Sequence, residues 1–141
     1  MPRRLKVLVT DDAAVMRHLL VHWLEKMIHC EITQAADGLE AIRKIREAAA
    51  QGNPFDLLLT DVKMPHVDGL RLVEYVRQKL MDHKTPIIVI TTFSDAAIRD
   101  QALRLGATGY ITKPLKYYEL LRAMIRLFGG YLTDEKRAAM G

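Results

Sequence analysis

Five residues that could do chemistry stand where short apolar runs of the sequence end. They are two neighbouring acids, a third acid, a hydroxyl and an amine: Asp11, Asp12, Asp61, Thr91 and Lys113. The run that ends at Asp61 reads FDLLLTD, and it is apolar enough for a strand buried on both faces, as in a parallel sheet. In α/β proteins the carboxyl ends of such strands meet in the crevice where ligands bind. The sequence therefore predicts that these groups share one crevice.

This set of groups favours metal-assisted phosphoryl transfer. Three carboxylates about 5 Å apart would repel each other by roughly 3 kcal/mol per pair at an effective dielectric constant near 20, so either some protonate or a cation neutralises them. Oxygen ligands favour a hard ion, and few protein ligands leave room for the waters that Mg²⁺ keeps. Lys113 would add a fixed positive charge. A metal, an ammonium group and a hydroxyl around one carboxylate suit phosphoryl transfer, and the carboxylate itself can be the nucleophile that forms an acyl phosphate.

The elements that must position these residues alternate along the chain between apolar runs of strand length and helical patterns. The strands expected are Leu5–Thr10, Glu31–Ala35, Leu57–Thr60, Ile87–Thr91 and Gly109–Thr112. The helices expected are Ala14–Met27, Leu39–Ala50, Gly69–Lys79, Ala96–Leu105 and Tyr117–Phe128. Asp37-Gly38 and Ser94-Asp95 offer helix N-caps, and Gly106 is suited to end a helix in the left-handed conformation.

This alternation predicts an α/β fold, a flavodoxin-like doubly wound (βα)5 sandwich. Its five-stranded parallel sheet would be covered by helices on both faces. The strand order expected is 2-1-3-4-5, which places the switch point between the first and third strands, where the three acids lie. Alternation alone does not fix this order. At 141 residues we expect one domain over residues 1–128. Residues 129–141 would be a short C-terminal tail or the start of a linker, with at most one short extra helix.

Composition indicates an ordinary globular protein of a reducing, cytoplasmic compartment. The net charge is +4, but lysine and arginine are scattered along helix faces, so no direct nucleic-acid binding is expected. The single cysteine, Cys30, excludes an internal disulfide and is expected to pack as a small apolar residue. No signal peptide precedes the first strand, and no stretch approaches the roughly 20 apolar residues of a membrane span.

Over about residues 5–128 the sequence resembles the response regulator receiver domain of two-component signalling. The motifs that carry the resemblance are TDDAAVMR at 10–17, DVKMP at 61–65 followed by Asp68-Gly69, TT at 91–92 and YITKP at 110–114. Their order and spacing match those of the family. The resemblance implies a phosphoacceptor switch, with no enzymatic activity beyond its own phosphotransfer and dephosphorylation.

The same resemblance implies a role for each site residue. Asp61 would accept a phosphoryl group from the phosphohistidine of a sensor histidine kinase or a histidine phosphotransfer protein. Lys113 would bind a phosphoryl oxygen, Thr91 would be the switch hydroxyl, and the Lys113-Pro114 peptide bond is expected to be cis. The ligands implied for Mg²⁺ or Mn²⁺ are Asp11, Asp12, Asp61 and the backbone carbonyl of Lys63.

A phosphoryl group on Asp61 would add charge and acceptor oxygens at a strand tip. The Thr91 hydroxyl can turn inward to meet it, and Tyr110 on the neighbouring strand is the candidate to fill the vacated space. The output face expected to bind a downstream target protein consists of Ala96–Leu105, Gly109–Thr112 and Lys116–Phe128. The protein is expected to be a monomer or a weak phosphorylation-dependent dimer.

Two positions depart from common family patterns. The side chain of Lys63 should overhang the site, and Thr92 is bulkier than the small residue often found after the switch threonine. Both could change access to Asp61 and the lifetime of a phosphoryl group.

Rival functions are less well supported by the sequence. A phosphohydrolase with an aspartyl nucleophile needs a second acid two residues later, where Asp11 is followed by Ala13 and Asp61 by Lys63. A flavin or nucleotide module would have a phosphate-binding loop after the first strand, where this chain has acids. A degenerate receiver would lack key residues. Two alternatives stay open: a stand-alone receiver of the chemotaxis type, which DDAAVMR favours, and a fragment of a larger regulator whose effector domain is missing.

Overall fold

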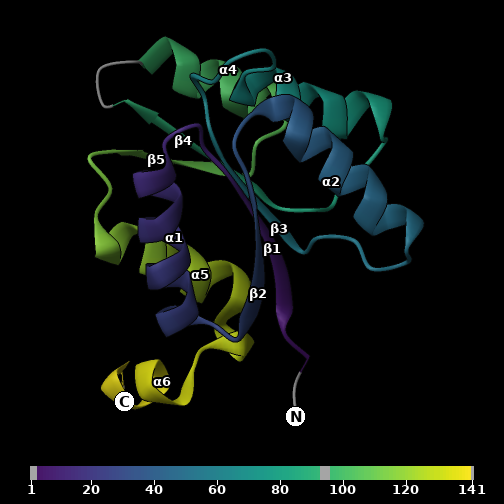
Figure 1. Ribbon diagram of the computed structural model, residues 1–141. Coiled ribbons are helices and arrows are strands. Elements are labelled where there is room, and N and C mark those ends of the chain that lie inside the picture. Colours follow the sequence, from purple (N-terminus) through teal and green to yellow (C-terminus); the bar gives the residue numbers. More distant parts are fainter. Residues whose placement is uncertain (1–2, 93–95, 141) are drawn as a thin grey trace.

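The computed structural model describes residues 3–92 and 96–140, and it contains one five-stranded parallel sheet in the order β2-β1-β3-β4-β5 (Figure 1). The strands are β1 (Leu5–Thr10), β2 (Cys30–Ala35), β3 (Leu57–Asp61), β4 (Ile87–Thr92) and β5 (Gly109–Lys113). All strands are parallel to their neighbours. The predicted flavodoxin-like topology is therefore confirmed, and four of the strands extend one residue beyond the expected bounds.

Helices cover both faces of this sheet (Figure 1). They are α1 (Ala14–Met27), α2 (Gly38–Ala50), α3 (Gly69–Glu74), α4 (Ala96–Leu105), α5 (Tyr117–Phe128) and α6 (Asp134–Met140). Alternate strand residues point to two separate cores, as the pleat requires. One core lies between the sheet and helices α1 and α5, and the other between the sheet and helices α2, α3 and α4.

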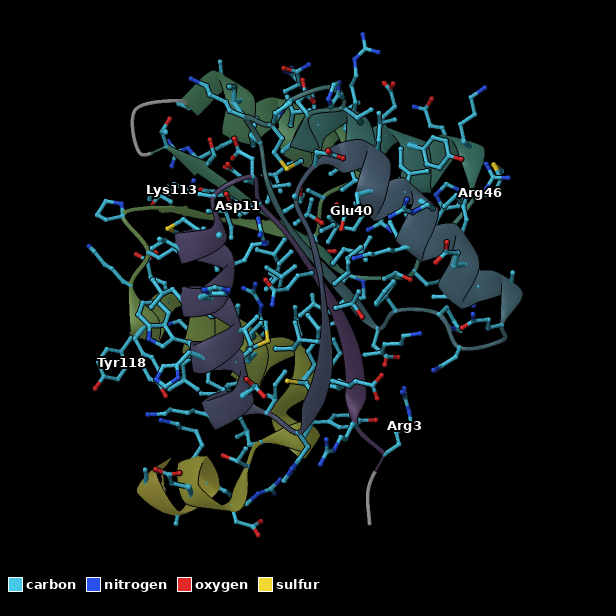
Figure 2. All side chains as sticks on the ribbon, viewed as in Figure 1. Arg3, Asp11, Glu40, Arg46, Lys113 and Tyr118 are labelled. Carbon is cyan, nitrogen blue, oxygen red and sulfur yellow. The ribbon has the colours of Figure 1, made fainter. Side chains whose placement is uncertain are left out.

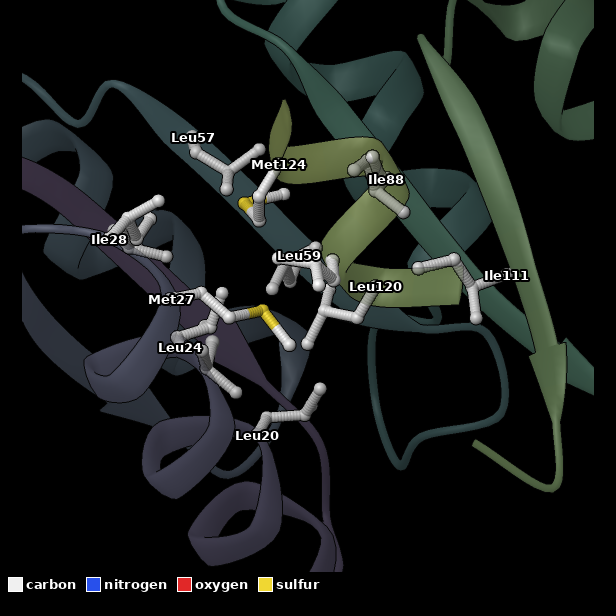
Figure 3. Packing of buried hydrophobic residues seen from close by; sticks show 14 of the residues in the cluster. Leu20, Leu24, Met27, Ile28, Leu57, Leu59, Ile88, Ile111, Leu120 and Met124 are labelled. Atoms are coloured by element: carbon white, nitrogen blue, oxygen red, sulfur yellow. The ribbon is translucent and has the colours of Figure 1, made fainter. Parts of the chain in front are cut away.

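Apolar residues of the central strands fill both cores. Figure 3 shows the first core, where Leu24 of α1 and Leu120 of α5 pack around Leu59 of β3. Leu58, the next residue before it, belongs to the second core. Every residue of β3 is buried, so Asp61 does end a strand that is covered on both faces. This packing holds the carboxyl ends of the strands in fixed positions.

The expected signals for helix ends are largely borne out. The Asp37 side chain accepts a hydrogen bond from the Glu40 amide at 2.8 Å and caps α2. Gly106, after α4, has φ of +113°, the left-handed conformation expected there. The proposed Ser94-Asp95 cap lies outside the described residues.

The helix expected over Gly69–Lys79 is confirmed in its bounds, and its second half, Tyr75–Lys79, is π-helical rather than α-helical. The wider turn contains Arg77, which is buried. Its Nε donates to the Gly106 carbonyl at 3.0 Å and its Nη1 to the Asp82 carbonyl at 2.9 Å. The turn thus places a buried arginine that ties the helical segment after α3 to the end of α4. The periodicity of the local sequence does not predict this contact, because its two residues are far apart in the chain.

The C-terminal segment is docked on the domain rather than frayed. The Gly129–Tyr131 turn leads into α6, and Leu132 is only 5% exposed and forms an antiparallel bridge with Ile28. The Thr133 amide donates to the Met27 carbonyl at 2.9 Å, and the Thr133 hydroxyl donates to the Lys26 carbonyl at 2.7 Å. These bonds satisfy carbonyl groups at the end of α1. The segment contains the short extra helix that the sequence allowed.

Two further expectations concern Cys30 and membranes. Cys30 is half-buried and packs against the first core, as predicted for a small apolar residue. This burial raises the pKa of its thiol to about 12, so the thiol stays neutral. Among the described residues, no helix has the length and apolar character needed to cross a membrane.

We expect Leu132→Ala to lower the free energy of unfolding by about 2–3 kcal/mol, because the substitution opens a cavity under the docked segment. Leu39→Ala is the matched control, since Leu39 is 53% exposed on α2 and should change stability little. Urea denaturation followed by circular dichroism measures both. Equal, small effects of the two substitutions would show that the segment does not contribute to the fold.

Candidate functional site

The ends of β1 and β3 bring the three predicted carboxylates together. Thr10 pairs with Thr60 in the parallel register, so Asp11 and Asp61 follow side by side at the edge of the sheet. Asp11, Asp12 and Asp61 each offer an oxygen, and these oxygens lie within 4.8 Å of one another. Asp11 and Asp61 are buried, whereas Asp12 is exposed. Solvent therefore reaches the cluster at Asp12.

Lys113 supplies the positive charge of this cluster. Its Nζ lies 3.3 Å from Oδ1 of Asp61 and 3.8 Å from Oδ2 of Asp11. Figure 2 shows Lys113 and Asp11 at the same edge of the sheet. The peptide bond between Lys113 and Pro114 is cis. One ammonium group faces three carboxylates, so an ionised cluster carries an excess of negative charge.

This excess disturbs the ionisation of the buried acids. Burial raises the pKa of Asp61, and the negative charge of Asp11 raises it further, although Lys113 and the Val62 amide act in the opposite direction. Burial also raises the pKa of Asp11, against a hydrogen bond of 2.9 Å that its Oδ1 accepts from the Ala13 amide. The ionised cluster is thus strained in the absence of a further cation.

The residues present fit a divalent metal ion. Oδ2 of Asp11 is buried and has no hydrogen-bond partner, and Lys113 at 3.8 Å is too distant to donate one. A buried carboxylate oxygen without a partner is costly, and a hard cation among three carboxylates would remove that cost. The Lys63 side chain is exposed, and its backbone carbonyl as a fourth ligand stays a prediction.

Gly69 fixes the backbone of Asp61, a role that the sequence reasoning did not assign. The Gly69 amide donates to the Val62 carbonyl at 2.8 Å. A Cβ at this position would lie 2.1 Å from the Asp61 carbonyl oxygen, so only glycine permits the approach. Asp68 caps α3 by accepting from the Arg71 amide at 2.9 Å. The Asp-Gly pair after DVKMP was the available signal, but its purpose depends on the contact.

Arg17 is a second residue whose role emerges only in the structure. Its Nη1 donates to the backbone carbonyl of Asp11 at 2.7 Å, and its Nε donates to Oε1 of Gln34 at 3.1 Å. The guanidinium group therefore links the end of β1 to the neighbouring strand β2. It holds the main chain of the acid pair from outside the cluster.

The two residues of the predicted switch lie on one face of the sheet. Thr91 pairs with Thr112 and Tyr110 pairs with Val89, a residue of the core under α4. Thr91 is buried, whereas the Tyr110 ring is 41% exposed with the Arg99 guanidinium 5.1 Å from its centroid. The Tyr110 ring therefore lies partly in solvent, and its inward rotation stays a prediction.

Comparison with known sequences decides the family. The sequence model of the response regulator receiver domain matches residues 7–125. The chain belongs to this family. It is a two-component response regulator receiver, as its motifs predicted, and receivers of this kind are signalling switches rather than classical enzymes.

Relatives of this receiver include proteins of similar length and much longer ones, of which the chain spans only a part. The "Probable chemotaxis protein CheY" of Rhizobium etli is 30% identical over 126 residues, which cover 89% of this chain and 94% of that protein. The "Osmosensing histidine protein kinase SLN1" of Saccharomyces cerevisiae is 30% identical over 130 residues, covering 89% of this chain but only 10% of the kinase. The solved structure of the chemotaxis response regulator CheY4 of Vibrio cholerae has a TM-score of 0.76 and 33% identity, covering 89% of this chain and all of that one.

We expect Mg²⁺ to stabilise the receiver at pH 8 and to have little effect on Asp11→Asn, because the substitution removes a carboxylate of the cluster. Without metal, Asp11→Asn should be about 1 kcal/mol more stable than the wild type, since it relieves the buried charge. Thermal unfolding with and without Mg²⁺ measures both effects. Asp100→Asn on the exposed surface of α4 is the control. Equal stabilisation of wild type and Asp11→Asn by Mg²⁺ would contradict the site.

Without metal, the contribution of Asp11 and Asp61 to the free energy of unfolding should become more favourable as the pH falls. The pKa values of Asp11 and Asp61 are higher in the native state than in an unfolded chain. The native state therefore binds protons more readily at these two carboxyl groups. As the pH falls towards their raised pKa values, the free energy of unfolding that the charged cluster takes away is recovered. Protons then compete with Mg²⁺, and the stabilisation by Mg²⁺ should fade over the same range. Comparing wild type with Asp11→Asn at each pH isolates this effect from other acids.

Proposed function

We propose that this receiver accepts a phosphoryl group on Asp61 in a Mg²⁺-dependent reaction and thereby controls the binding of a partner protein. The observation that carries the proposal is the environment of Asp61. Its carboxylate is buried beside a second buried acid, with the Lys113 ammonium at 3.3 Å. A lone surface carboxylate would need neither companion.

The chain's own groups suit an in-line transfer. A carboxylate oxygen of Asp61 would attack phosphorus in a phosphohistidine, forming a P–O bond while the P–N bond breaks and its electron pair returns to the imidazole. Lys113 would hold a phosphoryl oxygen, and the Val62 amide at 2.9 Å orients Oδ1 of Asp61. Asp11, Asp12 and Asp61 would hold Mg²⁺, or Mn²⁺ in its place, with the Lys63 carbonyl. The metal would neutralise charge on the transferring group.

The phosphodonor is proposed to be a sensor histidine kinase or a histidine phosphotransfer protein. The match to part of a protein named as an osmosensing histidine kinase supports a role beside such enzymes. The downstream target is proposed to bind the face formed by α4, β5 and α5, since the predicted switch residues end there. The receiver itself is proposed to span residues 1–128 and to act in the cytoplasm as a monomer or weak dimer.

We expect acetyl phosphate to phosphorylate the wild type only when Mg²⁺ is present, and Asp61→Asn to take up no phosphoryl group under either condition. Intact-mass spectrometry measures the incorporation. Asp100→Asn, an exposed acid of α4, is the matched control and should behave as wild type. Incorporation that survives the Asp61 substitution, or that ignores the metal, would refute the proposal.

The switch has its own test. Saturation with beryllofluoride, a phosphoryl mimic, should shift amide resonances of α4, β5 and α5 in wild type, because a filled site draws the Thr91 hydroxyl inward and alters the position of Tyr110. Thr91→Val keeps the buried shape without the hydroxyl, so its shifts should stay near Asp61. Nitrogen–proton correlation spectra measure both proteins. Unchanged resonances on the α4–β5–α5 face of saturated wild type would reject the mechanism.

A further inference from the structure

A pocket lies at the end of the sheet opposite the carboxylate cluster, between α2 and the helical segment that follows α3. Its volume is about 320 Å³, and no described residue is shared between it and the cluster. The lining residues that matter here are Arg46, Ala49, Phe55, Leu58, Val76 and Asp82. Phe55 and Asp82 precede β3 and β4, so the pocket lies at the amino ends of these strands. Figure 2 shows Arg46 on α2, away from Asp11 and Lys113.

The floor of the pocket is apolar. Phe55, Leu58 and Val76 are buried and belong to the core under α2, α3 and α4. Apolar cavities of about 150 Å³ bind benzene, and small-molecule pockets in proteins begin at about 300 Å³. A pocket of about 320 Å³ therefore has room for one aromatic ring or a short alkyl chain with a polar head.

One wall of the pocket is the π-helical turn. The Leu80 amide donates to the Tyr75 carbonyl, five residues earlier, at 3.1 Å, and Val76 and Leu80 both line the pocket. Met81 follows with φ of +55°, which is uncommon for a residue with a side chain, and Asp82 then stands at the mouth. π-Helical turns and left-handed residues of this kind concentrate at functional sites.

The mouth of the pocket offers an unused cation. Nη1 of the exposed Arg46 donates to the Tyr75 hydroxyl at 3.2 Å. Within the described part of the chain, Arg46 forms no ion pair, and no hydrogen bond uses its Nε or Nη2. Asp82 is engaged instead: Oδ1 accepts from the Lys84 and Thr85 amides at 3.0 Å, and Oδ2 accepts from the Thr85 hydroxyl. The open binding capacity at the mouth is therefore for an acceptor of hydrogen bonds.

We infer that this pocket binds a small amphipathic carboxylate. An aromatic ring or short alkyl body would lie on Leu58 and Val76, and the carboxylate would accept hydrogen bonds from Arg46. The inference goes beyond the proposed function, because it assigns a ligand to a region that contains no group of the phosphoryl site. Such a ligand would contact the turn in which Arg77 donates to the Gly106 carbonyl at 3.0 Å, and so the turn that holds the end of α4.

Charge and size select a monocarboxylate over two other classes of ligand. A cationic ligand would need Asp82, whose oxygens already accept from three donors. A nucleotide or phosphate ester would bring two or more negative charges next to the Asp82 carboxylate, where like charges repel. A single carboxylate at Arg46, with an apolar body of one ring, matches the one open cation and the apolar floor.

The probe for the test is 4-phenylbutyrate, compared with the uncharged 4-phenylbutan-1-ol. Methyl and amide resonances of the full chain are followed during titration, and we expect saturable shifts at Ile45, Leu58 and Val76. The acid should bind more tightly than the alcohol. Arg46→Gln should weaken binding of the acid by about two- to fivefold, as for an exposed charge pair, and should leave binding of the alcohol unchanged.

Matched variants control for charge and for space. Arg43→Gln removes an exposed arginine of the same helix outside the pocket, and it should leave both affinities unchanged. Ala49→Phe fills the pocket from its rim and should weaken both probes by about fivefold or more, because the added ring takes the place of the ligand. Ala50→Phe adds the same ring to the next, exposed position of α2 and should have no effect. All four substitutions change exposed positions, so the circular dichroism should stay that of the wild type.

Several results would overturn the inference. They are equal affinities for the acid and the alcohol, equal losses in Arg46→Gln and Arg43→Gln, undiminished binding by Ala49→Phe, or shifts that do not saturate. Phosphoryl incorporation from acetyl phosphate separates the inference from the proposed function, and Arg46→Gln should match the wild type there. Selective binding of the acid by a chain that takes up no phosphoryl group would support the pocket and refute the proposed function. Normal incorporation without selective binding would refute the pocket alone.

Discussion

The central constraint on this receiver is the crowding of three carboxylates at the ends of β1 and β3. Within residues 3–92 and 96–140, only the ammonium group of Lys113 lies within ion-pair distance of them, and burial makes the ionised forms of Asp11 and Asp61 costly. A fold would not hold these charges together for stability, because separating them in solvent would lower the free energy. The packed strands beneath supply the restraint, and the unpartnered oxygen of Asp11 marks where a cation would compensate the charge.

Residues around the cluster restrain the backbone rather than the charges. Gly69 lets the start of α3 approach the Asp61 carbonyl, and Arg17 holds the Asp11 carbonyl from the side of β2. Because both contacts are to main-chain atoms, they fix the backbone positions of Asp61 and Asp11 without neutralising the charge of the side chains. The site therefore combines a rigid frame with an unsatisfied charge, which is the arrangement that a ligand-dependent switch requires.

The α4–β5–α5 face is the surface on which the proposed switch would act. Thr91 and Tyr110 share one face of the sheet, and Arg99 stands over the Tyr110 ring at 5.1 Å. In the proposed switch, a change at the phosphoryl site would reach the surface through Thr91, Tyr110 and the Arg99 guanidinium group. Arg99 and Tyr110 also line a cavity of about 320 Å³ on this face.

The sequence by itself determined the strands and the polar residues at their ends, because residue type and periodicity distinguish a buried strand such as β3 from the helices that flank it. It also identified Asp11, Asp12, Asp61, Thr91 and Lys113 as one set. The order of the strands in the sheet was confirmed only by the structure. Only the tertiary structure decided the π-helical turn at Arg77, the docking of Leu132 and the contact of Arg99 with the Tyr110 ring. Each depends on contacts between residues distant in the chain, such as Arg77 with Gly106, and such contacts leave no local period to read.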